Sequence, residues 1–355
     1  MTRVAILGAG DMGTALLTPL LANGHDIRLW GTAFDEEIIA ALRRGDPHPR
    51  IGLVAPRSVA LFSHHEAEDA LRAVDVAVVA VTSHAVRPVM ADLGSLLDGA
   101  RAIVSVGKGF DVAANDGSVL RLSQVIAGFT PAPVVAVGGP AIAKEVARGT
   151  PTAAVFGGHD PAALALSRET FDTRDYFVET ITDTVGVEIA AAMKNAYGVA
   201  IGIADGLEKR TGLPHHNLRA ALFPLAIAEM GRMVQALGGR AETVNGLAGC
   251  GDLMVTVTSG RNRLLGERVG AGLSGAAAFA ELTAAGTTTE GYLAAASGYR
   301  LAARALGSSA AVAAQFPLLA ALYRILYQDA PPREELWTAV RIDGGRSENQ
   351  SGSQP

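Results

Sequence analysis

The chain has a single cysteine, Cys250, among 355 residues, and aromatic residues make up 5% of the sequence. One cysteine cannot form an intramolecular disulfide and fits a reducing cytoplasm. An excess of positive charge is also absent, since the formal net charge is −5 and Lys and Arg form no cluster. This balance argues against a basic surface of the kind that binds nucleic acid.

Membrane and metal signals are missing as well. The N-terminus begins with a predicted strand rather than a signal segment, and the most apolar long stretch, 185–203, contains Glu188 and Lys194. The eight histidines show no metal-ligand spacing, because adjacent histidines do not face one ion from one side of a helix. We expect a cytoplasmic protein with no membrane span and no metal site, and histidines on the surface or in loops.

The length predicts two domains, because 355 residues exceed one ordinary core. In the first half, short apolar runs rich in β-branched residues alternate with helical segments, a rhythm typical of a parallel, doubly wound sheet. After the first two strands, further strands are predicted at 74–81, 102–106, 134–137, 153–156 and 177–180.

From Thr184 onward the pattern changes to Ala-rich amphipathic segments, which predict helices. These segments cover 184–207, 216–238, 262–271, 276–284, 289–305 and 310–328. The predicted fold class is α/β followed by all-α, with a Rossmann-type dinucleotide-binding domain over 1–183 and a helical substrate and catalytic domain over 184–340. Residues 341–355 are polar and rich in Gly and Ser, and they predict a disordered tail.

A strand, a Gly-rich turn and a helix follow one another at the N-terminus. Residues 3–7 form a predicted buried strand, residues 8–13 have the sequence Gly-Ala-Gly-Asp-Met-Gly, and 14–23 have helical character. In this context Gly8 permits the tight turn, Gly10 lets the backbone approach a pyrophosphate, and Gly13 lets helix and strand pack closely. The pattern predicts a dinucleotide site.

The second strand, 26–30, ends near Thr32 and has neither the acid typical of NAD enzymes nor the Arg typical of NADP enzymes at its tip. Asp35 and Glu36 come slightly later, and we interpret them as the capped first turn of a helix over 35–44. The predicted cofactor is NAD, with NADP possible.

Lys194, with Asn195 beside it, lies in a long run of Ala, Val, Ile and Met. An ammonium among apolar neighbours is costly unless it is paired, and its pKa tends to fall toward the range of an acid/base catalyst. The alternative is a helix whose one charged residue extends to water. Lys194 is therefore the first residue to consider for chemistry.

Other candidates follow strands or lie in Gly-rich segments. Lys108, flanked by glycines, and Gly139, in a Gly-Gly-Pro turn, come just after strands, where ligands of doubly wound folds bind. Each could equally belong to an ordinary surface turn.

A second Gly-rich segment, 246–251, ends at Asp252, which could pair with Lys194. Thr256 follows, and Arg261 beside Asn262 suits a phosphate dianion. The alternatives are a loop with solvated arginines and, for the last candidate, Glu290, a carboxylate at a helix start.

The chain resembles the NAD(P)-dependent glycerol-3-phosphate dehydrogenase family in motifs that occur in the family's order: GAGDMGTAL, SVGKG, GGPAIAKEVARGTPT, AAAMKNAYGVAIGIADGL, NGLAGCGDL, RNR, TTTEG and FPLLAALYRILY. The resemblance extends from Val4 to about Leu336. It implies a Rossmann domain with a helical domain, as in 6-phosphogluconate dehydrogenase-like folds, and usually a homodimer. The implied reaction interconverts dihydroxyacetone phosphate and glycerol 3-phosphate.

Carried over by position, the resemblance makes Lys194 the general acid that protonates the ketone oxygen as hydride arrives, and the base in reverse. Lys108 and Asp252 join it as catalytic residues. Substrate contacts are implied for Asn195, Thr256, Arg261, Asn262 and Gly139. Cofactor contacts are implied for Gly8, Gly10, Asp11, Met12, Gly13, Thr32, Lys108, Ala143, Arg261 and Glu290.

The chain also departs from the family pattern. Asp11-Met12 replaces a Ser and an aromatic residue, Ala141 lacks a hydroxyl common in bacterial members, and Phe223–Ile227 replaces Ile-Thr-Arg-Gly-Leu after an unusually long loop at 208–216. We expect these changes to cluster at the substrate end.

Because of these departures, three other functions remain as alternatives. The same chemistry could act on another phosphorylated polyol, sugar or cyclitol. A catalytically silent nucleotide-binding protein is disfavoured, because a pure binder needs no proton donor. A ketopantoate or hydroxyacid reductase is disfavoured by Arg261 and Asn262, which suit a phosphate.

Overall fold

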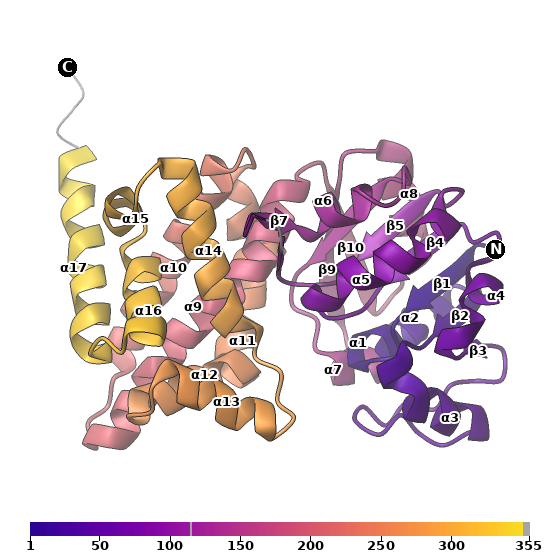
Figure 1. The fold of residues 1–355 in the computed structure, drawn as a ribbon, viewed down its shortest axis with the longest axis horizontal. Coiled ribbons are helices and arrows are strands. Elements are labelled where there is room, and N and C mark those ends of the chain that lie inside the picture. The colour runs from indigo at the N-terminus through magenta and orange to yellow at the C-terminus, as the bar shows by residue number, and fades with distance from the viewer. Residues whose placement is uncertain (114–115, 351–355) are drawn as a thin grey trace. The chain divides into compact units, whose positions relative to one another are not determined.

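The structure is a computed structural model that describes residues 1–113 and 116–350. It divides into two compact units, Met1–Glu188 and Ile189–Pro355. The first unit is a sheet with helices on its faces and the second consists of helices (Figure 1). The boundary predicted at 183/184 falls at the start of α9 (Thr184–Thr211), a helix that continues across the division.

Among the described residues the first unit contains an eight-stranded sheet in the order β10-β9-β8-β5-β4-β1-β2-β3. The strands are β1 (Arg3–Leu7), β2 (Asp26–Trp30), β3 (Ala60–Phe62), β4 (Val76–Val79), β5 (Ala102–Ser105), β8 (Val134–Gly138), β9 (Thr152–Gly158) and β10 (Tyr176–Ile181). β1 pairs in parallel with both β2 and β4, so the carboxyl ends of these three strands lie at one edge of the sheet. The predicted α/β class with a doubly wound sheet is confirmed.

The prediction of a wholly parallel sheet is wrong at one pair, because β9 runs antiparallel to β8. A parallel crossover needs a connection of about a dozen residues or more, usually including a helix that packs on the sheet. The connection here contains only the short helix α7 (Ala143–Ala147), and the chain returns beside β8 in the opposite direction. An antiparallel pair, β6 (Phe110–Val112) and β7 (Val119–Arg121), was also not predicted.

Apolar side chains of the strands alternate between two cores. In β1, Val4 and Ile6 belong to one buried cluster, whereas Ala5 and Leu7 belong to the other. Successive side chains of a strand point to opposite faces, so a strand that is apolar throughout must be covered on both. The helices that flank the strands are α1 (Asp11–Ala15), α2 (Leu17–Ala22), α3 (Glu36–Arg44), α4 (Ala67–Leu71), α5 (Ser83–Leu93), α6 (Leu122–Ala127) and α8 (Pro161–Phe171).

The second unit confirms the predicted helical character and corrects some of its details. Its helices besides α9 are α10 (His216–Ala236), α11 (Asp252–Ser259), α12 (Arg261–Ala271), α13 (Gly275–Ala284), α14 (Glu290–Leu306), α15 (Ser309–Gln315), α16 (Pro317–Gln328) and α17 (Pro332–Gln350). The segment predicted as one helix over 310–328 is two helices bent by 119°, because Pro317 begins a new helix.

α17 continues through residues that the sequence predicts to be part of a disordered tail. It packs against α16 and α10, and Asp343 forms an ion pair with Arg232 of α10 at 2.9 Å. This contact ties the helix to the unit beyond residue 341. Residues 351–355, the rest of the predicted tail, lie outside the described residues.

α9 is the core helix of the second unit. By length and composition it is the one helix, among the described residues, that could cross a membrane without being paired with another, but 94% of its apolar window is buried in the structure. A helix that is apolar on all sides and buried is typical of the interior of a large domain.

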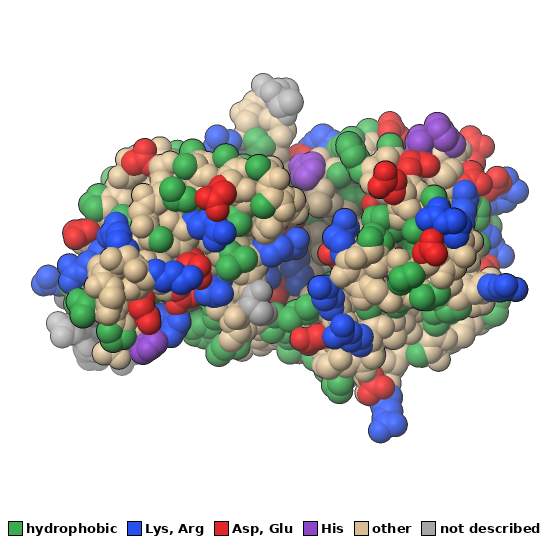
Figure 2. Space-filling model, turned by 90° about the horizontal axis from the view of Figure 1, so that it is seen from below, with side chains coloured by type: hydrophobic (Ala, Val, Ile, Leu, Met, Phe, Trp, Pro, Cys, Tyr) green, Lys and Arg blue, Asp and Glu red, His purple; other side chains and the backbone are tan. Residues whose placement is uncertain are grey.

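On the face of the molecule in Figure 2, acidic and basic side chains are mixed over each unit.

Glycines allow α12 to approach α9 closely. A Cβ at Gly202 or Gly206 of α9 would lie 2.4 or 2.0 Å from a carbonyl oxygen of α12. The reverse holds for Gly266 and Gly270 of α12, where a Cβ would lie 2.1 Å from a carbonyl oxygen of α9. Any side chain at these positions would force the helices apart, so the four glycines set their spacing.

Glu229 of α10 joins three helices inside the second unit. Its side chain is fully buried, and it accepts hydrogen bonds from the Tyr197 hydroxyl of α9 at 2.9 Å and from the backbone N–H groups of Leu318 and Leu319 at 2.6 and 3.0 Å. These N–H groups belong to the first turn of α16, which has no partners for them within the helix. Burial raises the pKa of Glu229 from 4.5 to about 7, although the same hydrogen bonds act to lower it.

We predict that Glu229 makes stability depend on pH near neutrality. Because its pKa is higher in the folded than in the unfolded chain, its contribution is complete below about pH 4.5 and is lost as the pH rises through about 7. The difference corresponds to about 3 kcal/mol. Urea denaturation from pH 5 to 8 should show this loss of stability in the wild type and not in Glu229→Gln. The control is Glu242→Gln, at an exposed glutamate, which should behave as the wild type does. Equal pH dependence in all three proteins would contradict the prediction.

Candidate active site

The Gly-rich turn has the backbone geometry that a dinucleotide pyrophosphate requires. Gly8, directly after β1, has φ +111°, and a Cβ at Gly13 would lie 2.0 Å from the Gly8 carbonyl oxygen. Only glycine therefore lets α1 pack this closely against the end of β1. A Cβ at Gly10 would meet no atom within 4 Å, so the backbone there is open to a ligand. The residues of this turn fit the cofactor that the fingerprint predicts.

Asp35 links Thr32, after the end of β2, to this Gly-rich turn. One oxygen of the Asp35 carboxylate accepts hydrogen bonds from the Thr32 backbone at 3.0 Å, from the Thr32 hydroxyl at 2.8 Å and from the Ala9 backbone at 3.3 Å. Asp35 takes part in a capping box, but with Thr32 at a short 3-10 helix, Ala33–Asp35, that precedes α3. At α3 itself, where the sequence predicts the cap, the Asp35 side chain makes no capping hydrogen bond.

A loop after α3 also reaches the Gly-rich turn, which the sequence did not indicate. His48 lies in a loop, as the sequence predicts for the histidines, but it is only 1% exposed, and its Nε2 lies 3.1 Å from the Ala9 carbonyl oxygen. Burial lowers the pKa of His48. Nearby, Arg50 forms an ion pair with Asp11, and Met12 packs against the core.

Two motifs that are distant in sequence meet at Lys108. Its ammonium donates a hydrogen bond to the carbonyl oxygen of Gly139 at 2.8 Å, and Gly139 has φ +106°. Ala143 begins α7, which contacts α1. The first unit therefore holds together, around the ends of its strands, the Gly-rich turn, Thr32, Lys108, Gly139 and Ala143.

In the second unit the structure brings Lys194, Asp252 and Thr256 together. Lys194 is 9% exposed and Asp252 is 2% exposed. The Lys194 ammonium lies 2.9 Å from a carboxylate oxygen of Asp252 and donates to the Thr256 hydroxyl at 2.7 Å. A buried ammonium is tolerated when an anion and hydrogen-bond acceptors replace water, and both are present. The alternative of an ammonium extended to water is wrong.

A π-helical turn delivers Asp252 to this position. The Gly-rich segment forms a π-helix, Leu247–Gly251, which leads directly into α11. A Cβ at Gly249 would lie 2.2 Å from the Val244 carbonyl oxygen, so the turn requires glycine there. Asp252 and Thr256 are four residues apart, which places both on the face of α11 toward Lys194.

Asn195, Asn262 and Glu290 form a hydrogen-bonded chain across three helices. The Asn262 amide donates to the Asn195 side-chain oxygen at 2.8 Å, and Asn195 donates to Glu290 at 3.2 Å. The Asn262 side-chain oxygen in turn accepts from the Gly291 backbone at 2.8 Å. The chain links α9, α12 and α14 beside Lys194.

Arg261 is the first residue of α12, and its side chain makes no hydrogen bond or ion pair with the residues that the structure describes. An arginine at a helix N-terminus combines a guanidinium with unsatisfied backbone N–H groups, which together suit an anion. All candidates in the second unit thus lie on or beside α9, α11, α12 and α14.

Of the departures from the family pattern, Asp11 and Met12 belong to the Gly-rich turn and Ala141 closely follows Gly139, whereas the segment 223–227 lies elsewhere. Phe223, Pro224 and Ile227 line two cavities along α10, whose lining does not include Lys194, Asp252 or Thr256. The expectation that they surround the substrate is therefore not supported. Among the described residues, no group of three or more His, Cys, Asp and Glu side chains is arranged to hold a metal ion.

Sequence models of two protein-family domains match the chain. The model described as NAD-dependent glycerol-3-phosphate dehydrogenase N-terminus matches residues 3–164, and the corresponding C-terminus model matches residues 183–336.

Individual proteins agree with these matches. An NADP(+)-dependent glycerol-3-phosphate dehydrogenase of Archaeoglobus fulgidus is 38% identical over 94% of this chain and 98% of its own length. A glycerol-3-phosphate dehydrogenase [NAD(P)+] of Geobacter sulfurreducens is 35% identical over 96% and 97%. The crystal structure of glycerol-3-phosphate dehydrogenase from Coxiella burnetii is 29% identical, with a TM-score of 0.79 over 95% and 98% of the two chains.

We predict that Asn262→Ala lowers the free energy of unfolding by about 1–3 kcal/mol, because the Gly291 N–H and the Asn195 side chain would both lose a buried partner. Urea denaturation measures this change. Asn217→Ala, at an exposed asparagine on α10, is the control and should change stability by less than about 0.5 kcal/mol. If both variants unfolded at the same urea concentration, the linking role of Asn262 would be refuted.

Proposed function

Because this chain belongs to the NAD-dependent glycerol-3-phosphate dehydrogenase family, it is an NAD(P)-dependent oxidoreductase that interconverts dihydroxyacetone phosphate and glycerol 3-phosphate, and we propose that Lys194 is the general acid and base of this reaction. The observation that carries the proposal is the position of the Lys194 ammonium, buried between Asp252 and Thr256. No other lysine of the described second unit is held in this way, since Lys209 is exposed and pairs with Glu267 at the surface.

The proposed reaction divides hydride and proton between cofactor and protein. The reduced nicotinamide, when bound, supplies the hydride to the ketone carbon. The carbonyl π electrons move to oxygen, which takes a proton from the Lys194 ammonium. In the reverse direction the neutral amine accepts the hydroxyl proton. Asp252 and Thr256 hold Nζ in place and stabilise its charged form through the 2.9 and 2.7 Å contacts.

We assign the substrate phosphate to the N-terminus of α12. Arg261 would contribute its guanidinium and, with Asn262, the first backbone N–H groups of the helix. Lys108 and Gly139, which are hydrogen-bonded to each other, would contact the substrate from the first unit. Asn195 would complete the polar site next to Lys194.

Cofactor contacts are proposed for both units. In the first unit, the pyrophosphate would lie at Gly8, Gly10 and Gly13. The open space around Gly10 supports this position, because a Cβ there would meet no atom within 4 Å. The other proposed contacts are Asp11, Met12, Thr32, Lys108 and Ala143 in the first unit and Arg261 and Glu290 in the second. Glu290 also accepts from Asn195, and this would couple the cofactor contact to the residue beside Lys194.

We also propose a cytoplasmic homodimer with a dinucleotide-binding domain followed by a substrate domain. The single cysteine supports the cytoplasmic location, and the family resemblance supports the dimer and the division of roles. Sedimentation of the purified chain would test the oligomeric state.

We predict that replacing Lys194 lowers kcat about 10²–10⁴-fold and leaves dinucleotide affinity unchanged, because general acid catalysis contributes about this much. The measurement is NADH or NADPH oxidation at 340 nm with dihydroxyacetone phosphate, beside a binding titration. Lys194→Ala leaves Asp252 buried and unpaired, which threatens folding.

Lys194→Arg resolves this difficulty, because it keeps the positive charge but cannot donate its proton near neutral pH. Its kcat should fall in the same range while its thermal stability stays close to wild type. The control is Lys209→Ala, an exposed lysine on the same helix. Wild-type turnover in Lys194→Arg would show that another group moves the proton.

A further inference from the structure

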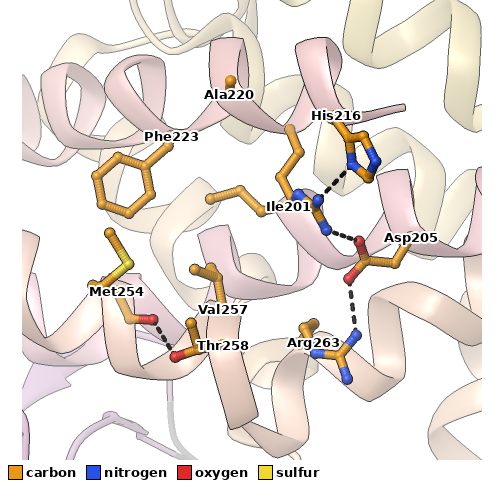
Figure 3. A pocket seen from close by; sticks show the side chains of 10 residues that line it. Ile201, Asp205, His216, Ala220, Phe223, Met254, Val257, Thr258 and Arg263 are labelled. Carbon is orange, nitrogen blue, oxygen red and sulfur yellow. Dashed lines mark hydrogen bonds and ion pairs between the residues drawn. The ribbon is translucent and has the colours of Figure 1, made fainter. Parts of the chain in front are cut away.

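A cavity of about 690 Å³ lies in the second unit between α9, α10, α11 and α12 (Figure 3). Ligand sites commonly have volumes of about 300–1,000 Å³, apolar walls and a few polar groups. None of the residues proposed for catalysis or cofactor binding lines this cavity. Its lining residues are Ile201, Asp205, His216, Arg219, Ala220, Phe223, Met254, Val257, Thr258 and Arg263.

We propose that this cavity binds an amphiphile with one anionic head group and a single apolar chain. The proposal is independent of the chemistry of Lys194. It follows from the two ends of the cavity, which differ in character.

The polar end carries an excess of positive charge. Asp205 forms ion pairs with Arg219 at 2.5 Å and with Arg263 at 2.9 Å, and Arg219 Nη2 lies 2.7 Å from His216 Nδ1. One carboxylate is thus shared by two guanidinium groups, as the dashed lines of Figure 3 show. Glu267 pairs with Arg263 too, but it is also bound to Lys209, so three cations face two acids.

Of the two arginines at this end, Arg219 is the more accessible to a ligand. Its side chain is 40% exposed, against 26% for Arg263. Its contacts with Asp205 and His216 use the two terminal nitrogens and fix the plane of the guanidinium. A fixed, planar guanidinium is suited to a carboxylate or phosphate. His216 adds a second donor when its Nε2 carries a proton, because its Nδ1 faces Arg219.

The other end of the cavity is apolar. Phe223 of α10 and Met254 of α11 stand opposite the charged group in Figure 3, and Ile201 and Val257 lie between them. Met254 is 51% exposed although it is a large apolar residue, and a methionine adapts to chains of different shape. An apolar chain bound here would cover this side chain.

A second cavity, of about 710 Å³, lies beside the first and is lined by both apolar and polar residues. It shares Phe223 with the first and continues along α10 past Pro224, Ile227 and Ala228.

The position of the site connects it to Lys194. Met254 and Val257 flank Thr256 on α11, and Thr256 accepts a hydrogen bond from the Lys194 ammonium. Ile201 and Asp205 lie on α9, the helix that carries Lys194. A ligand that moved α11 against α9 would alter the contact between Lys194 and Thr256. Glycerol 3-phosphate is a phosphate monoester, so the product of an enzyme that esterifies it with a fatty acid would be an amphiphile of the proposed class.

The test is a calorimetric titration of the full-length chain with dodecanoate and with monododecyl phosphate below their micelle concentrations. Both share the anionic head and apolar chain, and the tighter of the two identifies the head group. We expect saturable binding at least tenfold tighter than that of dodecanol, and no displacement by inorganic phosphate.

Variants locate the binding. Arg219→Gln and Phe223→Glu, which act on the two ends of the cavity, should each weaken binding at least tenfold, while Arg210→Gln, at an exposed arginine near the end of α9, should leave it unchanged. Dehydrogenase activity of Phe223→Glu at 340 nm shows that the variant is folded.

Two results would overturn the proposal. Binding that is absent, or equal in the wild type and in both cavity variants, would show that the cavity takes no such ligand. If the wild type bound neither amphiphile and Phe223→Glu converted a dimer to a monomer in sedimentation, the surface would belong to a contact with a second copy of the chain.

Discussion

The ion pair between Lys194 and Asp252 is the constraint on which the helical unit depends. α9 is apolar and buried, and a charge placed in it needs an anion at hydrogen-bond distance. Removing one partner of a buried ion pair costs about 3–5 kcal/mol, because the other charge is left without water or a counter-charge. The backbone around the pair must therefore hold Asp252 within about 3 Å of Nζ, and several features of the unit serve this.

Close helix packing is the first of these features. The glycines of α9 and α12 bring these helices together, and a Cβ at Gly198 would lie 2.7 Å from the Thr256 side chain of α11. The π-helical turn at Leu247–Gly251 then starts α11 with Asp252 toward Lys194. Asn262 and Glu229 act as polar links among apolar helices, and each satisfies backbone N–H groups at the start of another helix. Small residues and buried polar contacts thus hold the Lys194 ammonium in place.

Much of this arrangement could be predicted from the sequence. The strand, Gly-x-Gly-x-x-Gly and helix pattern predicts the geometry of Gly8, Gly10 and Gly13, because each glycine answers a local steric requirement. The pairing of Lys194 with Asp252 could be predicted because a lone charge in an apolar helix needs an oppositely charged partner. Asp252, at the end of a Gly-rich segment, was a candidate for that partner.

Other features depend on tertiary contacts that have no local signal. The reversal of β9 relative to β8 depends on how a short connection packs, and the continuation of α17 depends on its contact with Arg232. Glu229 could have been noticed as an acid within an apolar stretch of α10, but its partners come from α9 and α16, which are distant in sequence. His48 lies in a loop of ordinary polar composition, and nothing there indicates its burial.

The central claim is that the Lys194 amine itself carries the proton, and chemical rescue tests it most directly. In Lys194→Ala the missing side chain leaves room for a small primary amine next to Asp252. The account predicts that methylammonium or ethylammonium restores reduction of dihydroxyacetone phosphate in a saturable manner, and that tetramethylammonium at the same ionic strength does not. Equal rates with and without the amines, in a variant that still binds dinucleotide and substrate, would contradict it.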